Sequence, residues 1–226
     1  MMKYKIIYAL LILILFVSLQ NVDAQESDSE RFAVFFVPQY IITNGIRVDV
    51  DFRKAESGSW WVISPYYYSD GSSSSFLNPS DNYDYNTYTY KKLIGGGLGI
   101  SRKIFITKNK NKGFYAMLGA TYKYFKIDGD NLNYVEYTGD DGLTYYEMQD
   151  LEYSININSY AGQIILGHQF NPASKFYIDL FIGFGVKFSE HSSPENVMVK
   201  YNRGAIDYGY SGTQFIGGAR FGIALF

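Results

Sequence analysis

Residues 176–188 read FYIDLFIGFGVKF, and every second residue in this stretch is apolar. The residues between them form a mixed face that includes Asp179 and Lys187. A period of two over thirteen residues predicts a β-strand with one wholly apolar face. Strands of globular proteins are usually about 5–6 residues long, whereas strands that cross a membrane need roughly 9–11. The stretch therefore favours a membrane-spanning strand.

The same alternation occurs elsewhere in the chain. It is sharp at residues 46–53, where apolar residues alternate with Arg and Asp, and looser at residues 114–125. Eight strands is an even number, as in single-chain bacterial outer-membrane barrels. We therefore predict an all-β fold, an eight-stranded antiparallel up-and-down transmembrane β-barrel. The five remaining candidate strands are roughly 31–42, 60–68, 88–106, 156–170 and 210–226.

The lengths of the connections alternate along the chain. Outer-membrane barrels have short periplasmic turns and longer external loops, so the long connections are expected outside. The long connection from Asp128 to Glu152 holds eight acidic residues and no Lys or Arg. Asn44-Gly45 predicts a tight hairpin between the first two strands. The short connections are 54–59, 107–113 and 171–175, and the long ones are about 69–87, 127–155 and 189–209.

The N-terminus has the three-part pattern of a secretory signal. Lys3 and Lys5 precede an apolar run from Ile6 to Val17, and small residues occupy Val22 and Ala24. The run is shorter than the roughly 20 apolar residues of a spanning helix, which argues against an uncleaved anchor. We expect a signal peptide at 1–24, a short segment at 25–30 and the barrel domain at 31–226.

The composition excludes several classes of protein. The chain has no cysteine, which excludes disulfides, thiolate metal sites and a cysteine nucleophile. A net charge of −2 without a stripe of Lys and Arg argues against a nucleic-acid partner. No second segment is apolar enough to cross a bilayer as a helix, so a membrane location requires a closed sheet.

With this strand number, loop parity, alternation and terminal sequence GGARFGIALF, the chain resembles the small eight-stranded OmpA/OmpX-like outer membrane protein beta-barrel domain family, which includes PorT-like members. The resemblance covers residues 31–226. It implies a porin-like protein of the Gram-negative cell outer membrane, without enzymatic activity. The terminal register departs from the family pattern, because the alternate apolar positions lead to Leu225 and not to Phe226. Either a bulge shifts the phase there, or Phe226 points inward.

If the apolar faces meet lipid, eight charged side chains point into the lumen. A midplane Arg or Lys facing lipid would cost about 2–4 kcal/mol, and the interior of an eight-stranded barrel is only wide enough for side chains. We therefore expect a salt-bridged polar core in which Arg220 pairs with Asp179, Asp49 or Asp51. A proton path or a catalytic dyad is the alternative. The eight residues are Arg47, Asp49, Asp51, Arg53, Lys123, Asp179, Lys187 and Arg220.

Two motifs resemble ligand loops. Residues 95–99, GGGLG, lack the Lys-Ser/Thr of a phosphate loop and are expected to mark bends or bulges in a strand. Asp128-Gly129-Asp130-Asn131 starts like a calcium loop, but Gly139 stands where the bidentate Glu belongs. We predict a solvated acidic loop and no metal site. A loose divalent-cation site among Asp128, Asp130, Asp140 and Asp141 remains the alternative.

His168 and His191 are the only histidines. His191 lies beside Glu190, Ser192 and Ser193, the residue types of nucleophilic hydrolysis, but consecutive loop positions rarely give the required geometry. We therefore predict no catalytic residue, no cofactor and a non-enzymatic protein.

The expected partners of the protein are outer-membrane lipid and an extracellular protein or polysaccharide, bound through the long loops. The alternatives are an outer-membrane lipid-modifying enzyme and a secreted soluble β-barrel that binds an apolar ligand; a soluble β-sandwich is a further fold alternative.

Overall fold

The computed structural model describes residues 31–53, 59–71, 88–107, 111–173, 175–194, 201–202 and 204–225. They form a closed barrel in which each strand pairs with the next in the chain and the last pairs with the first. All pairs are antiparallel, which confirms the predicted all-β fold of eight antiparallel strands. The strands are β1 (Phe32–Phe36), β2 (Gly45–Phe52), β3 (Ser59–Gly71), β4 (Tyr88–Phe105), β5 (Gly113–Thr138), β6 (Thr144–Ala173), β7 (Phe176–Ser192) and β8 (Gly212–Ala224).

The two faces of the barrel wall differ as the alternation predicts. Inward-facing Asp179 on β7 is 0% exposed, whereas the outward-facing apolar side chains from Leu180 to Phe188 on that strand are 43–68% exposed. Outward side chains of β4 and β8 are also apolar, including Leu98, Ile100, Phe215 and Phe221. The barrel therefore carries an apolar belt on its outside, while Asp179 and Arg220 are among the charged side chains buried inside.

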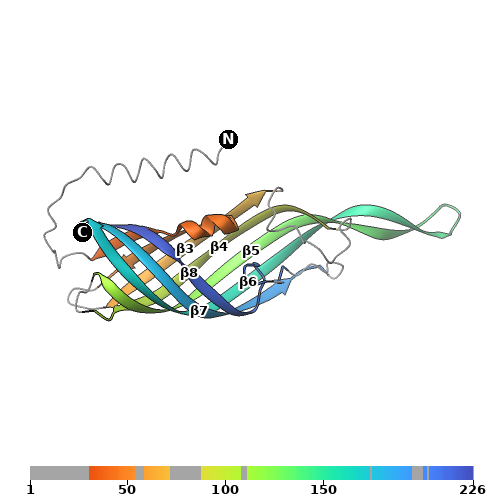
Figure 1. Ribbon diagram of the computed structural model, residues 1–226. Coiled ribbons are helices and arrows are strands. Elements are labelled where there is room, and N and C mark those ends of the chain that lie inside the picture. Colours follow the sequence, from red (N-terminus) through yellow and green to blue (C-terminus); the bar gives the residue numbers. More distant parts are fainter. Residues whose placement is uncertain are drawn as a thin grey trace.

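The two ends of the barrel are different (Figure 1). The chain enters β1 and leaves β8 at one end, the turn end, where β2, β4 and β6 also end. A long two-stranded ribbon projects from the other end, the ribbon end. The predicted signal peptide, residues 25–30 and Phe226 lie outside the described residues.

The prediction of one strand over 31–42 is wrong beyond Phe36. There β1 ends, and the 3-10 helix η1 (Pro38–Thr43) follows, with proline in its first turn. Proline has a fixed φ and no N–H, so it suits the first turn of a helix and cannot donate within a sheet. Among the described residues, no helix is long and apolar enough to cross a membrane.

The predicted two-residue hairpin at Asn44-Gly45 is also wrong. Asn44 instead ends η1 in the left-handed conformation, with φ 54°, and its N–H donates to the carbonyl of Ile41 at 3.1 Å. Asparagine tolerates this conformation better than most residues. The signal for a turn was therefore real, but it marks the end of a helix.

The short β1 leaves a seam in the wall. β1 pairs with β8 over four residue pairs, from Ala33–Ala224 to Phe36–Phe221, whereas β7 pairs with β8 over twelve. Residues 212–220 of β8 extend beyond the end of β1, and η1 lies beside them. The side chain of Gln39 packs directly against Gly218. We use "seam" for this stretch, where η1 takes the place of a strand between β8 and β2.

The prediction of a long loop at 127–155 is wrong. β5 and β6 pair without interruption from Gly113–Gln169 to Thr138–Thr144, and only residues 139–143 turn. The outer part, residues 128–154, is the ribbon visible in Figure 1. Eleven residue pairs at about 3.3 Å each give it a length of roughly 35 Å.

The glycines at 95–99 lie within β4 and not in a phosphate loop, but the expected bulge there is wrong, because their pairing with β3 and β5 is continuous and the register of β4 shifts only between Tyr90 and Lys92. A Cβ at Gly97 would lie 2.5 Å from the carbonyl oxygen of Tyr122 on β5, and one at Gly95 would lie 2.6 Å from the ring of Phe125. Only glycine fits at these two positions, because the backbone and side chains of the neighbouring strand β5 occupy the space that a Cβ would need.

Candidate functional site

Arg220 is the centre of a charged cluster inside the barrel. Its guanidinium donates to Asp179 at 2.8 Å, to both oxygens of Asp51 at 3.0 Å and to Asp49 at 3.1 Å. The sequence predicts that Arg220 pairs with one of these three aspartates, and in the structure it contacts all of them. It is 1% exposed.

The strand order explains how these residues meet. Asp179 on β7 is the register partner of Arg220 on β8. Asp51 lies on β2, separated from β8 only by the short β1, where Ala33 pairs with both Asp51 and Ala224. Arg220 therefore joins three strands across β1.

Lys103 also belongs to the cluster, and the sequence reasoning missed it. Its ammonium lies 3.1 Å from Asp179 and 3.5 Å from Asp51, and it also donates to Gln169. The hydroxyl of Tyr115 donates to Asp179 at 2.6 Å. The alternation of Ile100, Arg102 and Ile104 on the outer face of β4 places Lys103 on the inner face.

Arg47 extends the cluster towards the ribbon end. It donates to both carboxylate oxygens of Asp49, at 2.6 and 2.9 Å, and to the hydroxyls of Ser64 and Tyr40 at 3.3 Å. Its guanidinium also lies 5.3 Å from the centre of the Tyr66 ring. Two-pronged contacts of this kind fix the geometry of both partners.

Charges balance within this group, which we call the lumen cluster. Three carboxylates face three cations, and all of these side chains are buried. Buried ion pairs compensate for lost hydration only when each charge has close partners, and this arrangement supplies them. The lumen is filled by side chains at this level. The cluster consists of Arg47, Asp49, Asp51, Lys103, Asp179 and Arg220.

Three of the eight predicted lumen residues lie elsewhere on the inner wall. Arg53 is buried near the turn end, with its guanidinium 5.3 Å from the Trp60 ring. Lys123 and Lys187 line a separate cavity nearer the ribbon end. The inner wall therefore has two chemically distinct regions.

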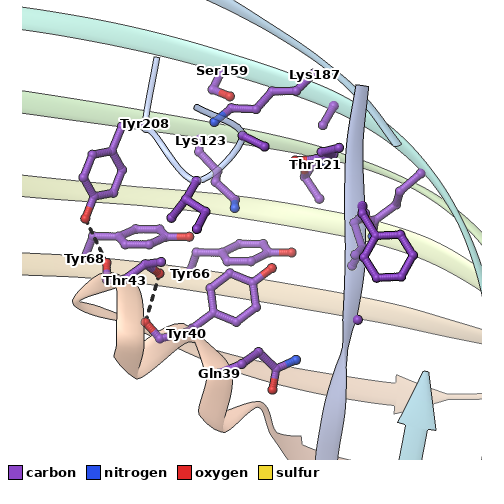
Figure 2. Close-up of a pocket in the computed structure, with 18 of the residues that line it drawn as sticks. Gln39, Tyr40, Thr43, Tyr66, Tyr68, Thr121, Lys123, Ser159, Lys187 and Tyr208 are labelled. Carbon is purple, nitrogen blue, oxygen red and sulfur yellow. Dashed lines mark hydrogen bonds between the residues drawn. The ribbon is translucent and has the colours of Figure 1, made fainter. Parts of the chain in front are cut away.

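The second region is a cavity of about 230 Å³, which we call the upper cavity. Figure 2 shows Tyr40 of η1 and Tyr66 and Tyr68 of β3 below Lys123. The ammonium of Lys123 lies 4.5 Å from the centre of the Tyr66 ring, which favours a cation over the ring face. The ammonium of Lys187 donates to the carbonyl of Asp207 at 2.8 Å.

The outer half of the ribbon is exposed, and neither of its faces is buried there. At its turn, the hydroxyl of Tyr145 donates to Asp141, which lowers the pKa of that carboxyl, and the Asp141 carboxylate accepts the N–H of Leu143 at 3.0 Å. Tyr137 stacks on Tyr145 with ring centres 5.5 Å apart. The ribbon thus has an ordered, acidic and aromatic tip.

The four aspartates of the alternative cation site do not come together. Asp130 pairs with Lys91 at 2.7 Å and Asp128 with Lys126 at 3.4 Å at the base of the ribbon, whereas Asp140 and Asp141 lie in the turn. In the described part of the chain, no group of three or more acidic or histidine side chains could hold a metal ion.

The histidines lie in structural surroundings. His191 faces inward and its Nε2 lies 3.0 Å from the carbonyl oxygen of Gly209. Neighbouring Glu190 and Ser192 point to the other face of β7. His168 lies between the rings of Phe114 and Phe170, with ring centres 4.5 and 4.3 Å away.

No protein-family model matches the chain, and no curated protein matches it. A similar solved structure is that of Acinetobacter baumannii CarO, with 11% sequence identity, a TM-score of 0.35, and coverage of 87% of this chain and 97% of that one. This degree of similarity carries no argument about function. Membership of the OmpA/OmpX-like or PorT-like family stays a prediction.

Proposed function

We propose that this chain is a non-enzymatic outer-membrane β-barrel that presents the acidic ribbon as a binding surface for an extracellular partner. The apolar belt around a closed ring of strands is the observation that carries the proposal. In lipid every backbone polar group must be paired internally, and a closed barrel achieves this with strands.

The distribution of polarity supports a lipid environment. Apolar patches above a few hundred Å² are rare on soluble monomers and mark contact with membranes or partners. Here the outward side chains of β7 are apolar from Phe176 to Phe188, while Asp179 and Arg220 are buried inside. A soluble barrel that binds an apolar ligand would have the opposite polarity.

The ribbon supports the binding role. It holds the eight acidic residues from Asp128 to Glu152 and no basic one, and the tyrosines of its outer half, including Tyr134 and Tyr146, are exposed. Tyrosine supplies a large contact area at low cost in conformational entropy. The chemistry favours a partner with a cationic surface, and a protein is the partner we propose.

Membrane location is tested by fractionation of cells that express the full chain. We expect the protein in the outer-membrane fraction, soluble only with detergent, and faster migration on gels without boiling than after boiling. Recovery in the soluble periplasmic or secreted fraction would contradict the proposal and favour the soluble barrel.

Partner binding is tested by photo-crosslinking from the ribbon. A photoreactive phenylalanine analogue at Tyr146 should give a discrete crosslinked protein, which disappears when Glu147 and Asp150 are changed to Gln and Asn. The same analogue at Phe184, on the apolar belt, is the matched control. Crosslinks from Phe184 alone would contradict the role of the ribbon.

The alternative of a lipid-modifying enzyme is tested separately. The variants His191→Ala and Ser193→Ala should leave the lipid composition of the membrane unchanged, because the His191 imidazole is engaged with the Gly209 carbonyl. A change in lipid A in either variant would favour the enzyme.

A further inference from the structure

Basic side chains outnumber acidic ones among the described residues that line the upper cavity. Lys123 and Lys187 both line it, and the two ammonium groups repel one another. The carboxylate that attracts Lys187 is that of Asp207, which also accepts the N–H of Gly204 at 2.9 Å. Among the described residues that line the upper cavity there are two lysines and no carboxylate, whereas acidic and basic side chains are equal in number in the lumen cluster.

Lys123 is held without an anionic partner. Its ammonium lies 5.2, 4.5 and 5.6 Å from the ring centres of Tyr40, Tyr66 and Tyr68. None of the ion pairs among the described residues includes Lys123. A cation removed from bulk water gains from an anionic partner, so this lysine is placed to receive an anion.

The other side of the upper cavity is apolar and lies at the seam. The lining includes Phe181 and Ile216, which face inward, and Phe215 and Gly217, which lie on the outward face of β8. The cavity therefore reaches both faces of β8, where η1 replaces a strand. Phe215 is 63% exposed and belongs to the apolar belt.

Gln39 adds a polar group at this place. Its side chain lies between η1 and Gly218 of β8 and lines the upper cavity (Figure 2). The side-chain oxygen is buried and, within the described part of the chain, has no hydrogen-bond partner. Buried polar groups are normally paired, which marks this position as one where a ligand or water is expected.

We propose that the upper cavity binds an amphiphilic carboxylate, with its head group between Lys123 and Lys187 and its acyl chain leaving through the seam beside Phe215. At about 230 Å³ the cavity is smaller than the roughly 300–1,000 Å³ of sites for drug-sized molecules. It therefore holds the head group and the first methylene groups, while the rest of the chain lies against the apolar belt. This proposal rests on the membrane location proposed above.

The test uses the full barrel in phosphatidylcholine nanodiscs and the probe 11-(dansylamino)undecanoate, with empty nanodiscs as background. We expect a saturable rise in dansyl fluorescence. The double variant Lys123→Met/Lys187→Met should bind about tenfold more weakly or worse, because a charged hydrogen bond is lost. Lys126→Met, an exposed position on the same strand, is the matched control and should bind like wild type.

Three further arms examine the seam and the ligand class. Ala161→Phe should fill the cavity and abolish binding, whereas Ala120→Phe, on the outer face, should not. The methyl ester of the probe should bind about tenfold more weakly or worse, since it lacks the charge. Dansylglycine, which is soluble and has no acyl chain, should bind at least tenfold more weakly.

Two results would overturn the proposal. One is equal binding of dansylglycine and the undecanoate, which would make the site one for small soluble anions. The other is unchanged binding in the double lysine variant. Each variant is first checked for heat-modifiable gel migration, so a failure of the membrane proposal appears in that assay and is distinguished from a failure to bind the probe.

Discussion

Arg220 illustrates how one side chain can organise the inside of this barrel. Its planar guanidinium has five donors in a fixed fork, and the structure uses it against Asp49, Asp51 and Asp179 at once. A lysine offers a single ammonium and could not reach both oxygens of Asp51 in the same way. The identity of this residue therefore matters beyond its charge.

We predict that Arg220→Met lowers the free energy of unfolding by about 3–5 kcal/mol, because it leaves buried carboxylates without their shared partner. The measurement is urea unfolding of the refolded barrel in detergent micelles. The control is Arg102→Met, an exposed outward arginine, for which we expect a change within about 1 kcal/mol. Equal effects of the two changes would contradict the role of the lumen cluster.

The sequence predicted the contacts of Arg220 but not those of Lys103. Residues 46–53 and 176–188 alternate cleanly, so the facing of their charges follows from the apolar positions. In residues 88–106 the glycines at 95–99 weaken the alternation, and the inner position of Lys103 follows only from the short run of Ile100, Arg102 and Ile104. Pairing distances within the lumen also depend on the barrel register, which no local pattern specifies.

At the scale of elements, two errors have distinct physical causes. Residues 31–42 were expected to be one strand because they are apolar, yet Pro38 removes a donor and η1 begins. The ribbon was expected to be a loop because it lacks alternation. A strand pair exposed on both faces has no buried side to select apolar residues, so its pairing leaves no period of two in the sequence.

We predict that Asn44→Val destabilises the protein more than Asn44→Gly by about 1–2 kcal/mol, the cost of a left-handed conformation for a residue with a Cβ. Both variants lose the side-chain contact to Asp70, at 2.8 Å, so their difference isolates the backbone. Urea unfolding of the two variants measures it. Equal stability would show that η1 rearranges when its cap is changed.

At the scale of the whole molecule, we infer that side chains block passage through the eight-stranded ring at the level of the lumen cluster. Small barrels of this size have interiors that side chains fill, and here the lumen cluster and Tyr115 occupy the level above the turn end. The upper cavity and the ribbon therefore lie beyond the lumen cluster, towards the ribbon end.

We predict that the protein gives no stepwise ion conductance in planar lipid bilayers and no swelling of liposomes in arabinose. A sixteen-stranded porin, with its aqueous channel, is the positive control. Discrete conductance steps from the wild-type protein would show that the lumen cluster opens. They would support the porin-like character that the family resemblance implies.

Because β1 is short, it affects both the order in which the barrel assembles and the place where the barrel opens locally. Four residue pairs join β1 to β8, whereas twenty-six join β5 to β6. Local opening is easiest where the fewest hydrogen bonds must break, so within the closed ring of strands the amide hydrogens of residues 33–36 should exchange with deuterium faster than those of residues 115–125 of β5. The barrel can therefore be described as a curved sheet that is closed by β1. We expect the pairing of β1 with β8 to be the last step of its folding.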